Sequence, residues 1–185
     1  MDKSVVVLGM EAAGKSLLVG KLRDICNGGA AHSDSKYVTD STPTIGVEMD
    51  TLTTCKPRAK ITFEIRELGG IMVQLWQKYF EECGVLVYVI DMAQVMQISA
   101  TCVELYNVLA DPRMNGVPTL LFLNKMDLDT GFTRSVLDGL LRLPDLQRSA
   151  KQKIDVIEGS AATGQGVDEV LDWLCANSDL VKRQS

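Results

Sequence analysis

The clearest chemistry lies in residues 9–16, which read Gly-Met-Glu-Ala-Ala-Gly-Lys-Ser and match the pattern GxxxxGK[ST]. The motif follows an apolar run and precedes an amphipathic stretch, which is the strand–loop–helix context of a phosphate-binding loop. Its glycines let backbone N–H groups turn inward around a polyphosphate, and the start of the helix adds partial positive charge. Lys15 is expected to reach the terminal phosphates, and Ser16 to offer its hydroxyl to Mg²⁺. The predicted phosphate-binding residues are Gly9, Glu11, Ala12, Ala13, Gly14, Lys15, Ser16 and Leu17.

A second motif, Asn124-Lys125-Met126-Asp127, predicts which base the site holds. The Asp127 carboxylate can accept hydrogen bonds from both N1–H and the amino group of guanine, whereas adenine offers no such pair of donors. Lys125 is expected to lay its aliphatic stem along the purine, and Asn124 to join the base to neighbouring loops. A pattern of four residues is weak alone, and it gains weight because an apolar strand-like run ends directly before it.

A third motif, Ser160-Ala161-Ala162, follows the apolar run 154–158. A backbone N–H of this loop is expected to donate to O6 of guanine. The three motifs each come at the end of a predicted strand, and the carboxyl ends of parallel strands are where α/β proteins bind ligands. The sequence therefore predicts a guanine-nucleotide site.

Apolar runs of strand length alternate with amphipathic helical stretches. The short gap between the second and third strands indicates an antiparallel hairpin at a sheet edge. We therefore predict an α/β fold with a mostly parallel six-stranded sheet, one antiparallel edge strand and helices on both faces. Residues 1–185 are expected to form a single domain in which 27–42 is a mobile loop. The predicted strands are 4–8, 47–54, 60–68, 85–91, 119–124 and 154–158, and the predicted helices are 15–25, 73–82, 98–110, 134–141 and 167–177.

Composition excludes several classes of function. The net charge of −5 argues against a broad nucleic-acid surface, so no nucleic-acid partner is expected. Five dispersed cysteines and a single histidine, His32, argue against zinc and indicate reduced thiols. Asp2 excludes myristoylation of a second-position glycine, and no apolar run is long enough to span a bilayer. We expect a cytoplasmic monomer with no direct membrane anchor, which reaches membranes only through partners.

The chain resembles the ADP-ribosylation-factor-like (Arf-like) branch of the Ras superfamily over nearly its whole length. Residues 9–16 look like the phosphate loop of that branch, and Pro43-Thr44-Ile45-Gly46 is similar to its first switch. Residues 75–80 resemble the helix after its second switch, and residues 166–174 its closing helix. The resemblance implies the fold of a P-loop NTPase small-GTPase domain, with GTP or GDP and Mg²⁺ as cofactors.

By this resemblance, the nucleotide controls two segments of the chain. Thr44 completes the Mg²⁺ shell with Ser16 when GTP is bound, and the Gly70 N–H contacts the γ-phosphate. Both contacts need the third phosphate, so hydrolysis releases both segments. The resemblance thus implies a regulatory switch with effector proteins, an exchange factor and an activating protein as partners.

Three departures from the family pattern bear on catalysis and partners. Glu67 stands where an aspartate usually holds Mg²⁺ through water, and its extra methylene extends the carboxylate by about 1.5 Å. Ile71 stands where a glutamine usually orients the attacking water, so we expect slow hydrolysis; Gln74 is a weak substitute because its spacing is wrong. The family's aromatic effector triad falls on Val47, Arg66 and Tyr79, which retain only the tyrosine.

Two readings of function remain open. The first is a GTP-binding switch that recruits effectors, by family analogy in membrane or ciliary traffic, with slow intrinsic hydrolysis. The alternative is a non-hydrolysing GTP-binding adaptor, which Glu67 and Ile71 motivate. A P-loop kinase for small molecules is disfavoured, because the base motif argues against it and the arginines that a lid would need lie in or beside helices.

Overall fold

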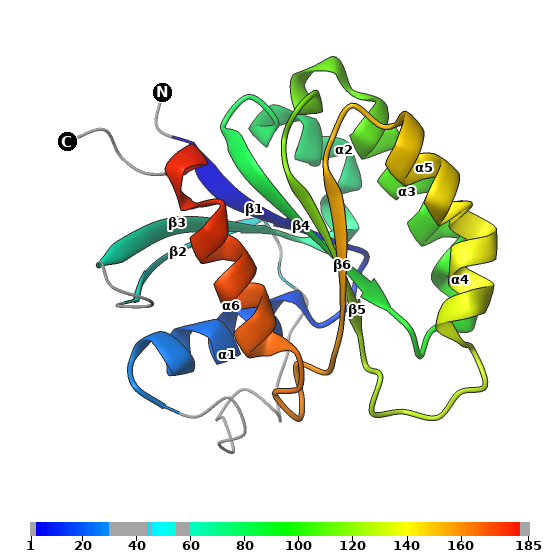
Figure 1. Ribbon diagram of the computed structural model, residues 1–185, viewed down its shortest axis with the longest axis horizontal. Coiled ribbons are helices and arrows are strands. Elements are labelled where there is room, and N and C mark those ends of the chain that lie inside the picture. Colours follow the sequence, from blue (N-terminus) through cyan, green and yellow to red (C-terminus); the bar gives the residue numbers. More distant parts are fainter. Residues whose placement is uncertain (1–2, 30–43, 45, 55–59, 182–185) are drawn as a thin grey trace.

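Within the residues that the computed structural model describes (3–29, 44, 46–54 and 60–181), six strands form one sheet in the order β2-β3-β1-β4-β5-β6 (Figure 1). All neighbouring strands run parallel except β2 and β3, which are antiparallel. The predicted mostly parallel sheet with one antiparallel edge strand is confirmed. The strands are β1 (Ser4–Leu8), β2 (Val47–Thr54), β3 (Ile61–Leu68), β4 (Cys83–Asp91), β5 (Thr119–Asn124) and β6 (Ile154–Glu158).

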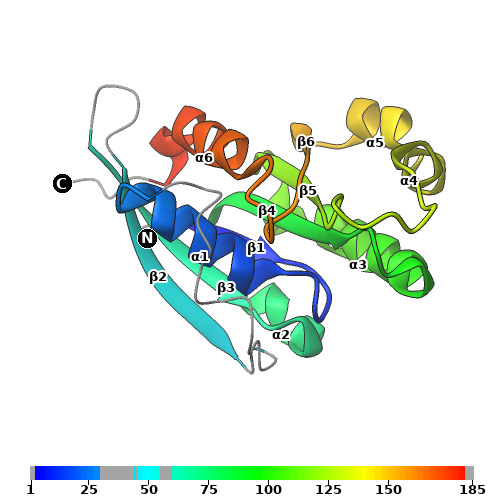
Figure 2. The same ribbon diagram turned by 90° about the horizontal axis from the view of Figure 1, so that it is seen from below.

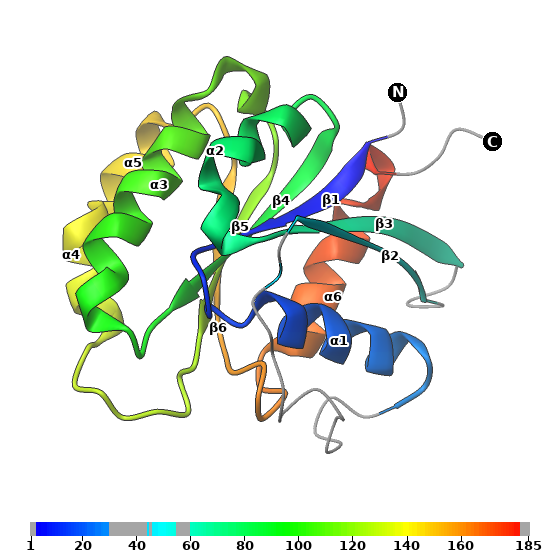
Figure 3. The ribbon, with the colours of Figure 1, turned by 180° about the vertical axis from the view of Figure 1, so that it is seen from behind.

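Helices cover both faces of the sheet. α1 and α6 lie on one face, as Figure 1 shows, and α2 and α3 cover the other face, which is nearer the viewer in Figure 3. Figure 2 shows the two layers with β1 and β4 between them. None of the described helices is long and apolar enough to cross a membrane. The helices are α1 (Lys15–Cys26), α2 (Val73–Trp76), α3 (Ile98–Ala110), α4 (Arg134–Leu141), α5 (Leu143–Ser149) and α6 (Val167–Ala176).

Strand alternation produces two cores, one on each face. Val5 and Val7 of β1 pack with α1 and α6, whereas Val6 and Leu8 pack in the cluster that includes residues of α2–α5. All four valine and leucine side chains are at most 2% exposed. Because both faces of the strand are buried, the sequence of β1 is continuously apolar rather than alternating.

The helix predicted over 73–82 is shorter than expected. α2 ends at Trp76, and a 3₁₀ turn follows over Gln77–Tyr79. β4 begins at Cys83, two residues before the predicted start at 85, and the Glu82 carbonyl accepts a hydrogen bond of 2.8 Å from the Ser4 N–H. Between α2 and β4, the N–H groups of Phe80, Glu82 and Cys83 each bond the carbonyl three residues earlier, so tight turns replace the α-helix.

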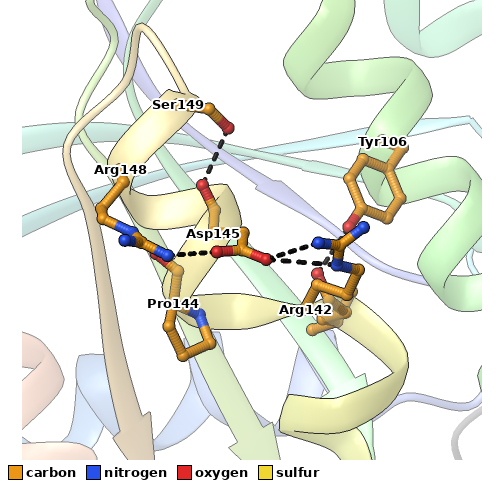
Figure 4. Close-up of polar contacts among 7 residues, drawn as sticks. Tyr106, Arg142, Pro144, Asp145, Arg148 and Ser149 are labelled. Carbon is orange, nitrogen blue, oxygen red and sulfur yellow. Dashed lines mark hydrogen bonds and ion pairs between the residues drawn. The ribbon is translucent and has the colours of Figure 1, made fainter.

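The sequence pattern did not predict α5. Arg142 adopts a left-handed conformation with φ 45°, which ends α4 and starts α5 at once. Pro144 lies in the first turn of α5, where its missing N–H costs no helical hydrogen bond. Asp145 then binds Arg142 and Arg148 on either side, as Figure 4 shows.

The topology brings one end of every strand to a common edge. The carboxyl ends of β1, β3, β4, β5 and β6 meet there because these strands are parallel. β2 is antiparallel and starts at the same edge, with Val47 opposite Leu68 of β3. Residues 30–42 of the predicted mobile loop lie outside the described part of the chain.

Candidate nucleotide-binding site

The loop between β1 and α1 has the conformation that its glycines permit. Gly14 has φ 92°, and a Cβ added there would come within 2.3 Å of the Asn124 amide nitrogen. A Cβ on Gly9 would lie 2.4 Å from the Val89 carbonyl oxygen. Ala12 is also left-handed, with φ 58°. Leu17 anchors the start of α1 against the core that α1 shares with α6.

Lys15 is folded back over this loop. Its side chain is 5% exposed, and Nζ donates to the Gly9 carbonyl at 3.0 Å and the Met10 carbonyl at 2.9 Å. Burial lowers the pKa of Lys15, while the negative charges of Glu67 and Glu11 act in the opposite direction. The ammonium group therefore lies at the mouth of the loop, where the sequence predicts the terminal phosphates.

Three oxygen-bearing side chains converge beside the loop. Ser16 Oγ donates to Glu67 Oε1 at 2.5 Å, and Thr44 Oγ1 lies 3.3 Å from both of these atoms. Glu67 is only 3% exposed. Burial raises its pKa, and the hydrogen bond from Ser16 and the charge of Lys15 partly oppose this rise. Hydroxyl and carboxylate oxygens are hard ligands of the kind that Mg²⁺ prefers, so this donor set fits the expected ion.

The chain leaving β3 touches both the first switch and the phosphate loop. A Cβ on Gly69 would lie 2.1 Å from the Thr44 carbonyl oxygen, and one on Gly70 would lie 2.2 Å from the Glu11 nitrogen. The Gly69 N–H also donates to the Gly46 carbonyl at 3.0 Å. These contacts leave no room for side chains at Gly69 and Gly70, so backbone meets backbone at this point.

Ile71 and Gln74, the two residues considered for positioning water, both face solvent. Ile71 is 57% exposed, and Gln74 lies on the exposed side of α2. Neither side chain makes a hydrogen bond to another residue in the described part of the chain. The structure therefore gives Gln74 no anchored position near the phosphate loop, and Ile71 contributes only an exposed apolar surface there.

Asn124 joins two of the predicted loops. Its side chain is 2% exposed, its Nδ2 donates to the Ala13 carbonyl at 2.7 Å, and its Oδ1 accepts from the Ala161 N–H at 2.8 Å. The amide thus connects the phosphate loop with the loop after β6. The expectation that Asn124 also joins the base to these loops stays a prediction.

Lys125 is held by a residue that was not predicted from the sequence. Its Nζ lies 2.6 Å from Oδ2 of Asp91, the last residue of β4, and Asp91 Oδ1 accepts from the Ala93 N–H at 2.8 Å. Lys125 itself has φ 67°. A signal was present, because Asp91 is an acidic residue that ends a strand at the same edge of the sheet.

The remaining residues that are predicted to bind the guanine base are partly exposed and partly buried. Asp127 and Ala162 are exposed, whereas Ser160 and Ala161 are buried. No described residue donates to the Asp127 carboxylate, so both of its oxygens are free to accept. Ser160 Oγ accepts from the Thr163 N–H at 3.1 Å, so this side chain stabilises the turn over residues 160–163.

The expected effector positions differ from one another in their surroundings. Val47 and Tyr79 are partly buried against the core. Arg66 forms ion pairs with Glu64 and Glu82, the first at 3.1 Å. The position that carries a family aromatic is thus occupied by an ion-paired guanidinium group.

Comparisons with known proteins identify the family of the chain. The model of the ADP-ribosylation factor family matches residues 1–178. The chain is 36% identical over 171 residues to human ADP-ribosylation factor-like protein 16, covering 92% of this chain and 84% of that protein. It is 28% identical over 181 residues to ADP-ribosylation factor-like protein 2 of Dictyostelium discoideum, covering 97% and 88% of the two chains.

A solved structure supports the fold. The Arl6 BBS3 small GTPase from Trypanosoma brucei, with the bound nucleotide analogue GppNp, superposes with a TM-score of 0.77 at 21% identity. The match covers 98% of this chain and 100% of that chain. Family model, sequence relatives and fold agree, and the chain belongs to the ADP-ribosylation factor family of small GTPases.

Proposed function

We propose that this chain is a GTP-binding regulatory switch that recruits effector proteins in its GTP-bound state and hydrolyses GTP slowly by itself. Family membership implies a GTP-binding switch, and the residues at the carboxyl edge of the sheet supply the functional groups that it needs. The predicted phosphate-binding and base-binding residues lie on neighbouring loops, which Asn124 connects.

One observation carries the proposal: Thr44 and Gly70 both contact residues of the predicted phosphate loop. The Thr44 hydroxyl joins Ser16 and Glu67, and the Gly70 backbone contacts the Glu11 backbone. Segments so close to the predicted phosphate loop can respond to a third phosphate bound there. The bound GppNp of the trypanosomal relative supports a guanine nucleoside triphosphate as the ligand.

The metal and the chain have separate tasks in this proposal. Ser16, Thr44 and Glu67 would hold Mg²⁺, and the bound ion would supply positive charge beside the phosphates. Lys15 adds a second positive charge, and the backbone N–H groups of the loop bind phosphate oxygens. Asp127, with its free carboxylate, selects guanine. Loss of the third phosphate removes the contacts that hold Thr44 and Gly70.

Slow hydrolysis follows from Ile71. Phosphoryl transfer to water depends on positioning the water and stabilising charge, and an exposed isoleucine offers no hydrogen bond for either task. An activating protein would have to supply an arginine and a group that positions water. The same observation favours the second candidate, a non-hydrolysing adaptor that binds GTP and acts as an interaction module.

Phosphate release separates the two candidates. The protein is loaded with GTP labelled on its γ-phosphate, and release is followed with and without cell lysate. The switch is expected to show slow release alone and faster release with lysate. Release at background in both conditions, with label still bound, would exclude the hydrolytic switch and leave the adaptor.

The partners are expected to differ from those of relatives that use three aromatic residues. An ion-paired Arg66 replaces one of these aromatics, so an effector surface here must accommodate charge. We propose a monomer in the cytoplasm that reaches membranes through its effectors, in membrane or ciliary traffic. Gel filtration with multi-angle light scattering measures the oligomeric state. Affinity capture with protein loaded with a non-hydrolysable GTP analogue identifies the effectors.

A further inference from the structure

We propose that Glu67 binds Mg²⁺ directly, as an inner-sphere ligand beside the Ser16 hydroxyl, and thereby replaces one of the waters on the ion. This inference rests on the proposed function, because it concerns the metal that accompanies the nucleotide. It differs from the expectation, drawn from resemblance, that the acidic residue here acts through water.

The spacing of three oxygen atoms is the first argument. Ser16 Oγ, Thr44 Oγ1 and Glu67 Oε1 are separated by 2.5, 3.3 and 3.3 Å. Mg²⁺ binds six ligands octahedrally at about 2.1 Å, so neighbouring ligand atoms lie about 3.0 Å apart. The three separations bracket this value, so the atoms are spaced like one face of an octahedron.

The reach of Glu67 is the second argument. A single carboxylate oxygen, Oε1, contacts both hydroxyls. It can therefore lie as close to a bound ion as the hydroxyl oxygens do. A carboxylate that acted through a water would have to stand back by the width of that water. An aspartate at this position would stand back by about 1.5 Å, because it is one methylene shorter. The longer side chain fills the space of the water.

Charge is the third argument. Glu67 is 3% exposed, and among the described residues no cationic side chain forms an ion pair with it. Lys15, whose positive charge acts on Glu67, directs its Nζ to the Gly9 and Met10 carbonyls instead. A buried carboxylate needs a partner of opposite charge, and a divalent cation bound between Glu67 and the hydroxyls provides one.

Counting the waters on the ion tests the inference. Mn²⁺ replaces Mg²⁺ in the complex of the full chain with GDP, and the broadening of its EPR lines in ¹⁷O-enriched water gives the number of bound waters. With Ser16, one phosphate oxygen and Glu67 as ligands, we expect about three waters on the wild-type complex. A count of about four would overturn the inference, since Glu67 would then lie outside the first shell.

A shortened side chain gives a second measurement. Glu67→Asp is expected to gain one bound water relative to the wild type. Glu48→Asp is the matched control, since this exposed carboxylate lies opposite Glu67 on β2 and should leave the water count unchanged. Equal counts in wild type and Glu67→Asp, with Mn²⁺ bound in both, would contradict the inference.

The same spectra separate this inference from the proposed function. A wild-type chain that shows no GDP-dependent binding of Mn²⁺ would refute the nucleotide switch itself, and the inference with it. A chain that binds Mn²⁺ and GDP together with about four waters retains the proposed function and refutes only the direct role of Glu67.

Discussion

Two residues of the base motif, Asn124 and Asp127, have opposite surroundings. Asn124 is buried, and its amide bonds two other loops of the protein. Asp127 is exposed, and no described residue donates to it. Asn124 therefore stabilises the protein whether or not a ligand is bound, whereas Asp127 is available for a ligand alone.

Replacement of Asn124 by alanine is expected to destabilise the nucleotide-free protein. The Ala13 carbonyl and the Ala161 N–H would both lose their partner in a buried place, at a cost of about 1–3 kcal/mol each. Urea denaturation without nucleotide measures this loss. Asp127→Ala is the control, and it should leave the free energy of unfolding nearly unchanged while weakening GDP binding. Equal stability of the two variants would show that the Asn124 bridge contributes nothing.

Replacement of Ile71 by glutamine is expected to accelerate GTP hydrolysis. The new side chain can hydrogen-bond water at a position that is now exposed and apolar, and water positioning of this kind justifies an increase of at least roughly tenfold. Single-turnover phosphate release checks the rate. Ile71→Leu keeps the apolar character and should hydrolyse GTP at the wild-type rate. An unchanged rate in Ile71→Gln would mean that residue 71 does not reach the attacking water.

At the scale of elements, apolar periodicity predicted most of the fold and failed where tertiary contacts decide. The elements with the predicted bounds are β1, β2, α3, β5, α4 and β6, because the pattern of apolar residues is a local property of the chain. The start of β4 depends instead on its pairing with β1, where the Glu82 carbonyl accepts from the N–H of Ser4, a residue far away in the sequence.

The start of α5 shows a second limit of sequence reasoning. Proline usually marks a break, yet Pro144 lies in the first turn of α5, where it is tolerated. The left-handed Arg142 that starts this helix has no sequence signal, since glycine or asparagine is the usual residue in that conformation. In the site, Asp91 was missed for a related reason, because its partner Lys125 lies in the loop after another strand, β5.

A substitution in α4 tests whether the stability of this helix can change without a change in nucleotide binding. Gly139 lies inside this helix, and a Cβ added there would meet no atom within 4 Å. Gly139→Ala should therefore stabilise the protein by about 0.5–1 kcal/mol, without a change in GDP affinity. Thermal and urea unfolding measure the gain. Gly166→Ala is the opposite control, because its Cβ would lie 2.6 Å from the Glu158 carbonyl oxygen. A loss of stability in Gly139→Ala would contradict the helix geometry.

At the scale of the whole molecule, the site depends on both halves of the sheet. The phosphate residues follow β1 and β3, and the base residues follow β5 and β6. Unfolding separates these loops, so a ligand that contacts all of them binds only the folded chain. Nucleotide binding should therefore raise the free energy of unfolding, by about 2.7 kcal/mol when the ligand is at 100 times its dissociation constant.

This linkage allows base specificity to be measured as stability. In Asp127→Asn the amide can donate to the C2 carbonyl of xanthine, but it can no longer accept from both N1–H and the amino group of guanine. Xanthosine diphosphate should therefore stabilise the variant by about 2.7 kcal/mol at 100 times its dissociation constant, and GDP at the same concentration should stabilise it much less. Asp129→Asn, an exposed aspartate two residues further on, should keep the wild-type preference for GDP. If GDP stabilised Asp127→Asn as strongly as the wild type, Asp127 would not be the residue that selects the base.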